Sequence, residues 1–194
     1  QAHIYPFFDW DESLVEKVKG MNAPWLDGIM ELVSKPGTYL GSAISYVVLL
    51  VPAFRWGGWR LASFVIVVAL LELLIVDGTK ALVGRPRPLS GPEVEFGSFP
   101  SGHVLHSVIF LGLVWLIVAP RISQLRSRTL LAGFFSFICL LVGVSRVYLD
   151  RHWPSDCLGS LLIGSLALMG LWVAWRRFIP QEIDRPRSIG KGRE

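Results

Sequence analysis

Three basic residues of this 194-residue chain lie in surroundings that suit the binding of a phosphate group. Lys80 and Arg146 each end a long apolar run, and Arg87 follows Lys80 by seven residues and precedes a proline. The planar guanidinium of arginine can pair with two phosphate oxygens, and a lysine ammonium supplies a point charge. Because no matching set of acids accompanies these cations, they predict an anion site.

Two histidines stand beside these cations in contexts that suit phosphoryl transfer. Ser101-Gly102-His103 opens an apolar run, so the free N–H groups and the positive dipole end of a helix would point at one place. Asp156 follows His152 at the i, i+4 spacing, which lets its carboxylate accept a hydrogen bond from one imidazole nitrogen and leaves the other free. Two such histidines can act as nucleophile and proton donor.

The elements that must position these residues are long apolar helices. Crossing a hydrocarbon core of about 30 Å takes about 20 helical residues. The chain is 52% hydrophobic, and a soluble helical bundle is disfavoured because its helices would need polar stripes, whereas these runs are apolar all round. We therefore expect an all-α membrane helical bundle with an N-terminal interfacial segment and five spans, at about 38–54, 61–79, 103–119, 129–146 and 156–175.

The charges between the runs predict the orientation of the bundle. Arginines fill the first and third connections and the C-terminal tail, and two predicted helices separate each of these regions from the next. The positive-inside rule places these three regions in the cytoplasm. The connections near 80–102 and 147–155 carry the candidate site and then face outward, as expected for a multi-pass protein of the bacterial cytoplasmic membrane.

The stretch before the first span is expected to lie in the outer membrane interface. Its acids, including Asp11, are expected to stay in water. Insertion of residues 21–35 as a short span and unassisted translocation remain alternatives, and a further apolar stretch is expected before Gln1. The residues expected to rest on lipid are Trp10, Leu14, Trp25, Leu26, Ile29 and Met30. The chain is therefore expected to have three regions. They are an interfacial segment over residues 1–37, a transmembrane catalytic domain over 38–177 and a basic cytoplasmic tail over 178–194.

Two carboxylates inside the second apolar run need partners. A charged side chain at the centre of a span costs about 2.5–3.5 kcal/mol on insertion scales, so each should face the bundle interior. Asp77 lies one turn before Lys80 and is expected to pair with it. Glu72 is expected to make a hydrogen bond within the bundle. His106, one turn beyond His103, is expected to support or pack rather than to catalyse.

The remaining polar residues and the cysteines exclude several classes of protein. The net charge is +4, but the basic residues form short clusters between apolar runs, which argues against a nucleic-acid partner. Cys139 and Cys157 are expected to be small buried side chains rather than a disulfide. Arg85 is a candidate for contact with a substrate head group, and Asp150 and Arg151 are expected to be loop charges.

The motifs together resemble those of the type-2 phosphatidic acid phosphatase family. The family pattern is Lys-six residues-Arg-Pro, then Pro-Ser-Gly-His, then Ser-Arg-five residues-His-three residues-Asp. The resemblance covers about residues 38–176 and includes the placement of the motifs at helix ends. Every position is matched, by Lys80, Arg87, Pro88, Pro100, Ser101, Gly102, His103, Ser145, Arg146, His152 and Asp156.

This resemblance implies a metal-independent phosphatase that needs no cofactor and acts through a phosphohistidine. It implies that His152 is the nucleophile, that Asp156 orients it, and that His103 is the general acid for the leaving oxygen. It also implies that the phosphate is held by Lys80, Arg87, Ser101, Gly102 and Arg146.

The expected substrate is a lipid phosphate presented at the membrane surface. Phosphatidylglycerol phosphate, phosphatidic acid and an isoprenyl pyrophosphate all remain open, because nothing in the apolar helices selects among them. One alternative is a lipid phosphotransferase, in which an acceptor hydroxyl replaces water. Another is a membrane transporter or scaffold with a vestigial site. The related vanadate-dependent haloperoxidases share the motifs, but membrane-spanning helices argue against that activity. The sequence does not indicate an oligomeric state.

Overall fold

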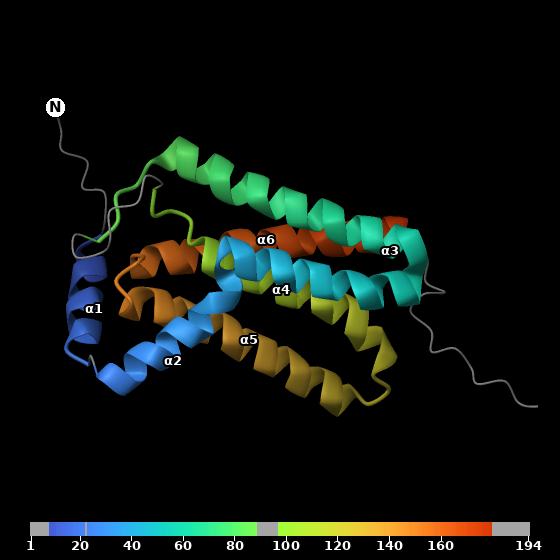
Figure 1. Ribbon diagram of the computed structural model, residues 1–194, viewed down its shortest axis with the longest axis horizontal. Helices are drawn as coiled ribbons and strands as arrows, with labels where there is room; N and C mark the ends of the chain where they lie inside the picture. The colour runs from blue at the N-terminus through green and yellow to red at the C-terminus, as the bar shows by residue number, and fades with distance from the viewer. Residues whose placement is uncertain (1–7, 22, 89–96, 180–194) are drawn as a thin grey trace, which may run out of the picture.

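The computed structural model describes residues 8–21, 23–88 and 97–179, and within them the expected all-α class is confirmed (Figure 1). Two short helices, α1 (Asp9–Lys19) and α2 (Pro24–Ser34), precede four long ones. The long helices are α3 (Tyr39–Val83), α4 (Gly102–Val118), α5 (Leu125–Tyr148) and α6 (Pro154–Phe178). Two single 3-10 turns, η1 (Lys35–Gly37) and η2 (Ala119–Arg121), follow α2 and α4.

Helix α3 contains the first two predicted spans and reverses direction between them (Figure 1). Gly58 has φ 59° and ψ −153°, a conformation that a residue with a Cβ rarely adopts, and the helix turns back there. The Tyr39 hydroxyl donates to Asp77 at 2.9 Å, and the Tyr46 hydroxyl donates to Glu72 at 2.5 Å. The start of the helix therefore lies against its end. We call residues 39–57 the first limb and residues 59–83 the second limb.

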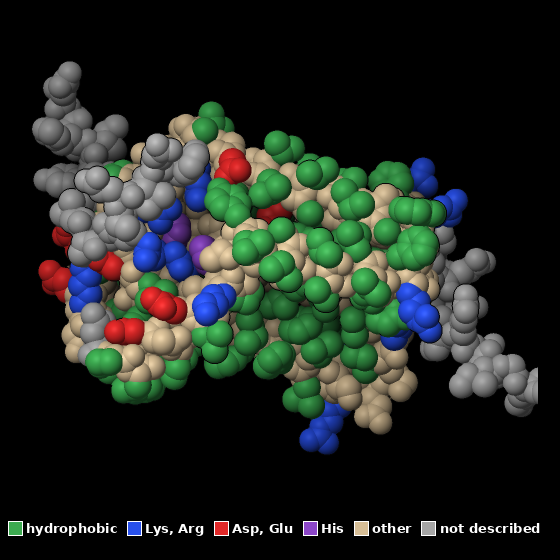
Figure 2. Space-filling model, in the orientation of Figure 1, with side chains coloured by type: hydrophobic (Ala, Val, Ile, Leu, Met, Phe, Trp, Pro, Cys, Tyr) green, Lys and Arg blue, Asp and Glu red, His purple; other side chains and the backbone are tan. Residues whose placement is uncertain are grey.

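Four of the described helices, α3 to α6, are long and apolar enough to cross a membrane. This count takes α3 as one helix, so it does not show the five spans expected from the sequence. Large apolar side chains lie exposed along the length of the bundle (Figure 2), where a membrane would supply apolar surroundings. Examples with more than half of their surface exposed are Val47, Val51, Leu74, Phe137, Leu140, Leu162, Leu166 and Met169.

Helix α4 lies at the centre of the bundle and packs against α3, α5 and α6. Its buried side chains Leu105, Ile109 and Leu113 belong to the main core cluster, together with Leu61 and Val65 of α3. Burial of such side chains on three sides fixes the direction of α4. The turn that precedes α4 is thereby held at the end of the bundle, beside the ends of α3 and α5.

The helices of the N-terminal segment pack on that same end of the bundle. Helix α1 contacts α5 and α6, and α2 contacts α5. Helix α2 has 11 residues, about 16 Å at 1.5 Å per residue, which is too short to cross a membrane alone. The hydroxyl of Tyr148 donates to Asp27 at 2.6 Å, and the hydroxyls of Ser34 and Ser145 share a hydrogen bond of 2.8 Å. The segment is therefore tied to the end of α5 that carries Arg146.

Two predictions about this segment are wrong. Met30 is buried instead of resting on lipid, because α2 turns it toward the bundle. Asp11 is fully buried instead of staying in water, because it contacts Arg85 and Ser155. Trp10, Leu14, Trp25 and Ile29 are exposed as expected, and Leu26 is half-buried. Residues 1–7 of the interfacial segment and 180–194 of the predicted tail lie outside the described residues.

Candidate active site

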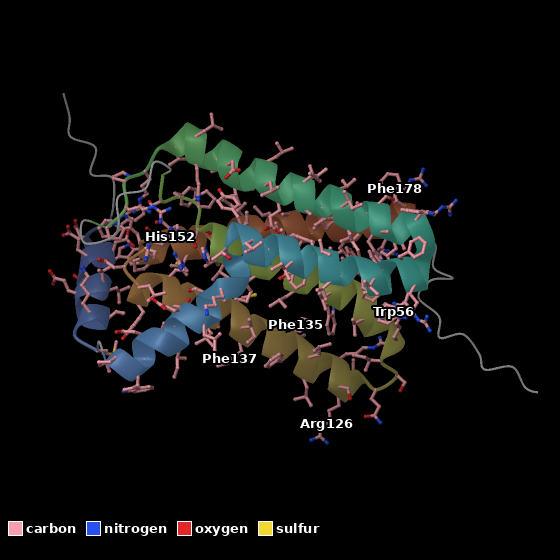
Figure 3. The ribbon with its side chains drawn as sticks, viewed as in Figure 1. Trp56, Arg126, Phe135, Phe137, His152 and Phe178 are labelled. Carbon is pink, nitrogen blue, oxygen red and sulfur yellow. The ribbon has the colours of Figure 1, made fainter. Side chains whose placement is uncertain are left out.

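One cavity of about 250 Å³ brings together six of the predicted site residues. The cavity lies at the end of the bundle that carries α1 and α2, where histidine and basic side chains gather (Figure 2). Figure 3 shows His152 at this end and Trp56 and Phe178 at the other. The six residues come from α3, the segment after it, α4, α5 and the loop before α6, and they are Lys80, Arg87, Gly102, His103, Arg146 and His152.

The imidazole of His152 is buried and held by one hydrogen bond. Its Nδ1 lies 2.8 Å from the carbonyl oxygen of Ser98. A carbonyl can only accept, so Nδ1 carries the hydrogen and Nε2 keeps its lone pair. Burial lowers the pKa of His152 to about 4; the nearby carboxylate of Asp156 opposes this shift, and the positive charges of Arg146 and Arg87 add to it. His152 is therefore a neutral nitrogen base at physiological pH.

The carboxylate of Asp156 does not make the hydrogen bond that its spacing from His152 suggests. Its Oδ2 lies 3.6 Å from His152 Nδ1, which is beyond hydrogen-bond range. Instead Oδ2 accepts from the backbone N–H of Trp153 at 3.0 Å, and Oδ1 accepts from Arg85 at 2.5 Å. Asp156 thus caps the start of α6, while the carbonyl of Ser98 orients the ring. The prediction of a hydrogen bond between Asp156 and His152 is wrong.

The turn before α4 contributes less backbone to the cavity than the sequence suggests. The N–H of Ser101 donates to the Ser160 hydroxyl at 2.7 Å, and Ser101 is fully buried and does not line the cavity. Its own hydroxyl is buried with no hydrogen-bond partner among the described residues. Gly102 and His103 do line the cavity. Ser101 therefore lies behind the cavity wall, and a bound phosphate would meet Gly102 and His103 first.

The three cations surround the cavity without being neutralised by Asp77. Asp77 accepts from the hydroxyl of Tyr39, and no ion pair joins it to Lys80 among the described residues, so the predicted pair is wrong. Arg87 donates to the carbonyl of Arg151 at 2.8 Å, and burial lowers its pKa. Arg146 is buried, and its Nε has no hydrogen-bond partner in the described chain. An oxyanion bound in the cavity that Arg146 lines would be a suitable acceptor for this donor.

A family model assigns these residues to a known group of proteins. The model of the PAP2 superfamily matches residues 60–180, which is more than half of the chain. The chain belongs to the PAP2 superfamily. The resemblance seen in the motifs is thereby confirmed.

Three relatives of this PAP2 chain are similar over most of their length. Phosphatidylglycerophosphatase B of Bacillus subtilis is 27% identical over 175 residues, covering 80% of this chain and 78% of the relative. An undecaprenyl-diphosphatase of Sulfolobus acidocaldarius is 29% identical over 177 residues, covering 86% and 74%. The crystal structure of a transmembrane PAP2 type phosphatidylglycerolphosphate phosphatase from Bacillus subtilis superposes with a TM-score of 0.76 at 24% identity, covering 86% and 85%. The PAP2 chain is a multi-pass integral membrane protein.

Glu72 of the PAP2 chain has the bundle partners that the sequence could not name. Its carboxylate accepts from the hydroxyl of Tyr46 at 2.5 Å and lies 2.9 Å from Nδ1 of His106. His106 is buried and stacks on Phe110, so it supports Glu72 as expected of a packing residue. Glu72 also lines the cavity, which the sequence did not indicate. The hydrogen bond expected for Glu72 within the bundle is confirmed.

The cavity has a wall that sequence reasoning missed. It is formed by the turn between α2 and α3 and the first residues of the first limb, with Gly37 packed directly on His103. Lys35-Pro36-Gly37-Thr38 is recognisable as a turn followed by a helix cap. Nothing in these residues says which other helix end they meet. The residues of this wall are Gly37, Thr38, Tyr39 and Ser42.

Proposed function

We propose that this PAP2 chain is a lipid phosphatase that transfers the phosphoryl group of a lipid phosphate first to His152 and then to water. The observation that carries the proposal is the state of His152, a buried and neutral imidazole whose Nδ1 hydrogen is used in a hydrogen bond to Ser98. Its Nε2 is the nitrogen available for attack, and His152 lines a cavity that three cations also line. The names of the relatives, a phosphatidylglycerophosphatase and an undecaprenyl-diphosphatase, support the substrate class. We propose phosphatidylglycerol phosphate, phosphatidic acid or an isoprenyl pyrophosphate.

The reaction uses the two histidines in turn. Nε2 of His152 attacks phosphorus while the bond to the lipid oxygen breaks, and protonated His103 gives its proton to that oxygen. His103 then takes a proton from a water molecule as the water oxygen attacks the phosphohistidine. The nitrogen–phosphorus bond breaks, its electron pair returns to Nε2, and inorganic phosphate leaves. His103 is protonated again, so the cycle closes without any further reactant.

Fixed cations stabilise the charge that develops on the phosphoryl oxygens. Lys80, Arg87 and Arg146 line the cavity, and the start of α4 at Gly102 adds the positive end of a helix dipole. Ser101 contributes by shaping this turn from behind. These groups supply the positive charge that a divalent ion would otherwise provide, so we propose that the reaction needs no metal.

The site is proposed to face outward across five membrane crossings. Each limb of α3 is at least as long as α4, which has 17 residues. With each limb crossing once, the arginine-rich connections lie together at the end of the bundle away from the cavity, and the positive-inside rule makes that end cytoplasmic. A lipid phosphate could then keep its tail in the bilayer while its head group enters the cavity. The arginines in question are Arg55, Arg60, Arg121, Arg126, Arg128, Arg176 and Arg177.

Phosphate release by the purified protein in detergent tests the proposal. We expect inorganic phosphate from at least one of the three lipid classes in excess EDTA, and an acid-labile phosphoryl group on the wild-type protein that is missing from His152→Ala. Release from none of the lipids would refute the function. Loss of activity in EDTA that magnesium restores would refute the metal-independent mechanism. Phosphate that appears on an added lipid alcohol instead of in solution would assign a phosphotransferase.

A further inference from the structure

A buried cluster of charges lies behind the nucleophile and does not line the cavity. It consists of Asp11, Arg85 and Asp156, which we call the charge cluster. Both carboxylates are fully buried, and the side chain of Arg85 is 10% exposed. Asp11 belongs to α1, outside the residues 60–180 that the family model matches. The cluster therefore joins the N-terminal helix to the residue next to His152.

Asp11 uses both of its oxygens to bind the start of α6 and Arg85. Its Oδ1 accepts from the backbone N–H of Ser155 at 2.8 Å. Its Oδ2 accepts from the Ser155 hydroxyl at 2.6 Å and from Arg85 at 2.8 Å. Asp11 thus satisfies an N–H group in the first turn of α6 from another helix and holds one side of the guanidinium. Because each oxygen of this buried carboxylate has at least one hydrogen-bond donor, the contact of Asp11 with α6 and Arg85 is specific.

Arg85 reaches both groups that face Nδ1 of His152. Its guanidinium donates to Oδ1 of Asp156 at 2.5 Å, while Oδ2 of the same carboxylate lies 3.6 Å from the imidazole. Its backbone carbonyl accepts from the N–H of Ser98 at 2.7 Å, and the carbonyl of Ser98 accepts from the imidazole. A shift of Arg85 would therefore move two groups together, the carboxylate of Asp156 that faces His152 and the carbonyl of Ser98 that accepts its hydrogen bond.

We propose that Asp11 and Arg85 are positioning residues that hold the nucleophile in its reactive orientation, with Asp11 acting through Arg85. This inference rests on the proposed function of His152. It makes α1 a part of the active site, whereas the sequence alone suggests an interfacial helix. Asp11 touches neither the substrate cavity nor His152, so its loss affects the chemical step more than substrate binding.

The charges of the cluster also favour the attack of His152 on phosphorus. One guanidinium shared by two carboxylates leaves one negative charge, and the carboxylate of Asp156 faces the imidazole. When Nε2 bonds to phosphorus while Nδ1 keeps its hydrogen, the ring of His152 becomes positive. Asp11→Asn removes one carboxylate charge at nearly constant shape, so the positive ring loses part of its compensation.

Steady-state kinetics of Asp11→Asn test the proposal, with Glu12→Gln as the matched control. Glu12 is the next residue of α1 and is exposed, so the control removes the same charge without touching the cluster. We expect kcat for a lipid phosphate to fall by about 10- to 100-fold in Asp11→Asn, as for groups that set catalytic geometry, with KM unchanged. A wild-type kcat in Asp11→Asn, or an equal fall in Glu12→Gln, would overturn the assignment.

A double-mutant cycle tests whether Asp11 acts through Arg85. Arg85→Lys keeps the positive charge but loses the fork that spans the two carboxylates. If the residues act as a unit, the double variant Asp11→Asn/Arg85→Lys has the kcat of Arg85→Lys alone. Losses that multiply would show independent roles and overturn the proposal. Should Asp11→Asn fail to fold, the kcat and KM of Arg85→Lys decide, because a fall in kcat alone is expected there too.

Binding of orthovanadate separates this inference from the proposed function. Vanadate can accept a histidine nitrogen as a fifth ligand, as phosphorus does in the transition state, whereas sulfate cannot. We expect Asp11→Asn to weaken vanadate binding, measured by calorimetry in detergent, and to leave sulfate binding unchanged. Equal vanadate affinity in wild type and Asp11→Asn would overturn the inference. If the wild type bound vanadate but released no phosphate from lipids, the proposed function would fail and the vanadate comparison would still decide this inference.

Discussion

Gly37 offers a direct test of the wall that η1 builds against His103. A Cβ at this position would lie 2.7 Å from Cδ2 and 2.8 Å from both Cα and Cβ of His103. Ordinary contacts to a Cβ begin near 3.4 Å, so the methyl group of Gly37→Ala intrudes by roughly 0.6–0.7 Å. Two of the three atoms cannot rotate away, because they belong to the backbone and the first side-chain carbon. Either η1 or the start of α4 must move.

The size of this movement sets the expected effects of Gly37→Ala. Overpacking of this kind costs about 1–3 kcal/mol of unfolding free energy. A displacement approaching 1 Å at a catalytic group lowers the rate by up to about 100-fold. We therefore expect a lower melting temperature and a clear fall in kcat. If His103 is the general acid, the fall is smaller for a nitrophenyl phosphate, whose leaving group needs less protonation.

A matched glycine controls for the added methyl group. Gly28 lies inside α2, and a Cβ there would meet nothing within 4 Å. Gly28→Ala should leave kcat unchanged and stabilise the helix by up to about 1 kcal/mol. Wild-type kcat and melting temperature in Gly37→Ala would refute the close contact between η1 and His103, and with it the wall of the cavity that depends on this contact.

Four further predictions follow from the same site. His103→Ala lowers kcat for lipid phosphates more than for a nitrophenyl phosphate, and equal losses would contradict its role as general acid. Protonation of His152 removes the proposed nucleophile, and its pKa is lowered to about 4, so the loss of kcat/KM on acidification that reports this group should lie near pH 4. Because the folded pKa of His152 also lies below the unfolded value, the unfolding free energy falls by about 3 kcal/mol between pH 6.5 and 4, a loss that His152→Asn lacks. Glu72→Ala leaves buried hydrogen-bond partners unsatisfied and costs about 1–3 kcal/mol in a denaturation assay, whereas the exposed Glu31→Ala changes little. In Glu12→Cys the new thiol reacts with an impermeant reagent added outside cells, and reaction only from the cytoplasmic side would reverse the proposed orientation.

The helices and the residues of the candidate site could be predicted from the sequence because both depend on local patterns. Apolar runs of membrane length must form helices whatever they pack against. The motif positions then lie at helix ends, and the structure places Lys80, Arg87, Gly102, His103, Arg146 and His152 around one cavity. A one-dimensional pattern is sufficient here because the membrane aligns helix ends at a common depth.

Partner choice among polar groups could not be predicted, because it depends on the packing of segments far apart in the chain. The i, i+4 spacing made Asp156 the expected partner of His152, yet the carbonyl of Ser98 takes that bond, since a backbone acceptor leaves no mark in the sequence. The spacing predicts that Asp77 pairs with its neighbour Lys80, but the reversal of α3 brings Tyr39 to it instead. Spacing along a helix shows which contacts are possible and not which one forms.

The sequence by itself therefore determined the membrane-spanning helical class, the position of each motif at a helix end and the cationic character of the site. Only the tertiary structure decided that α1 is joined to Asp156, beside His152, through Asp11 and Arg85, which lie 74 residues apart in the sequence. The physical reason is the range of the interactions. The length of an apolar run and its helix caps act within one segment. A buried charge instead pairs with whichever segment of the chain the fold brings within about 3 Å.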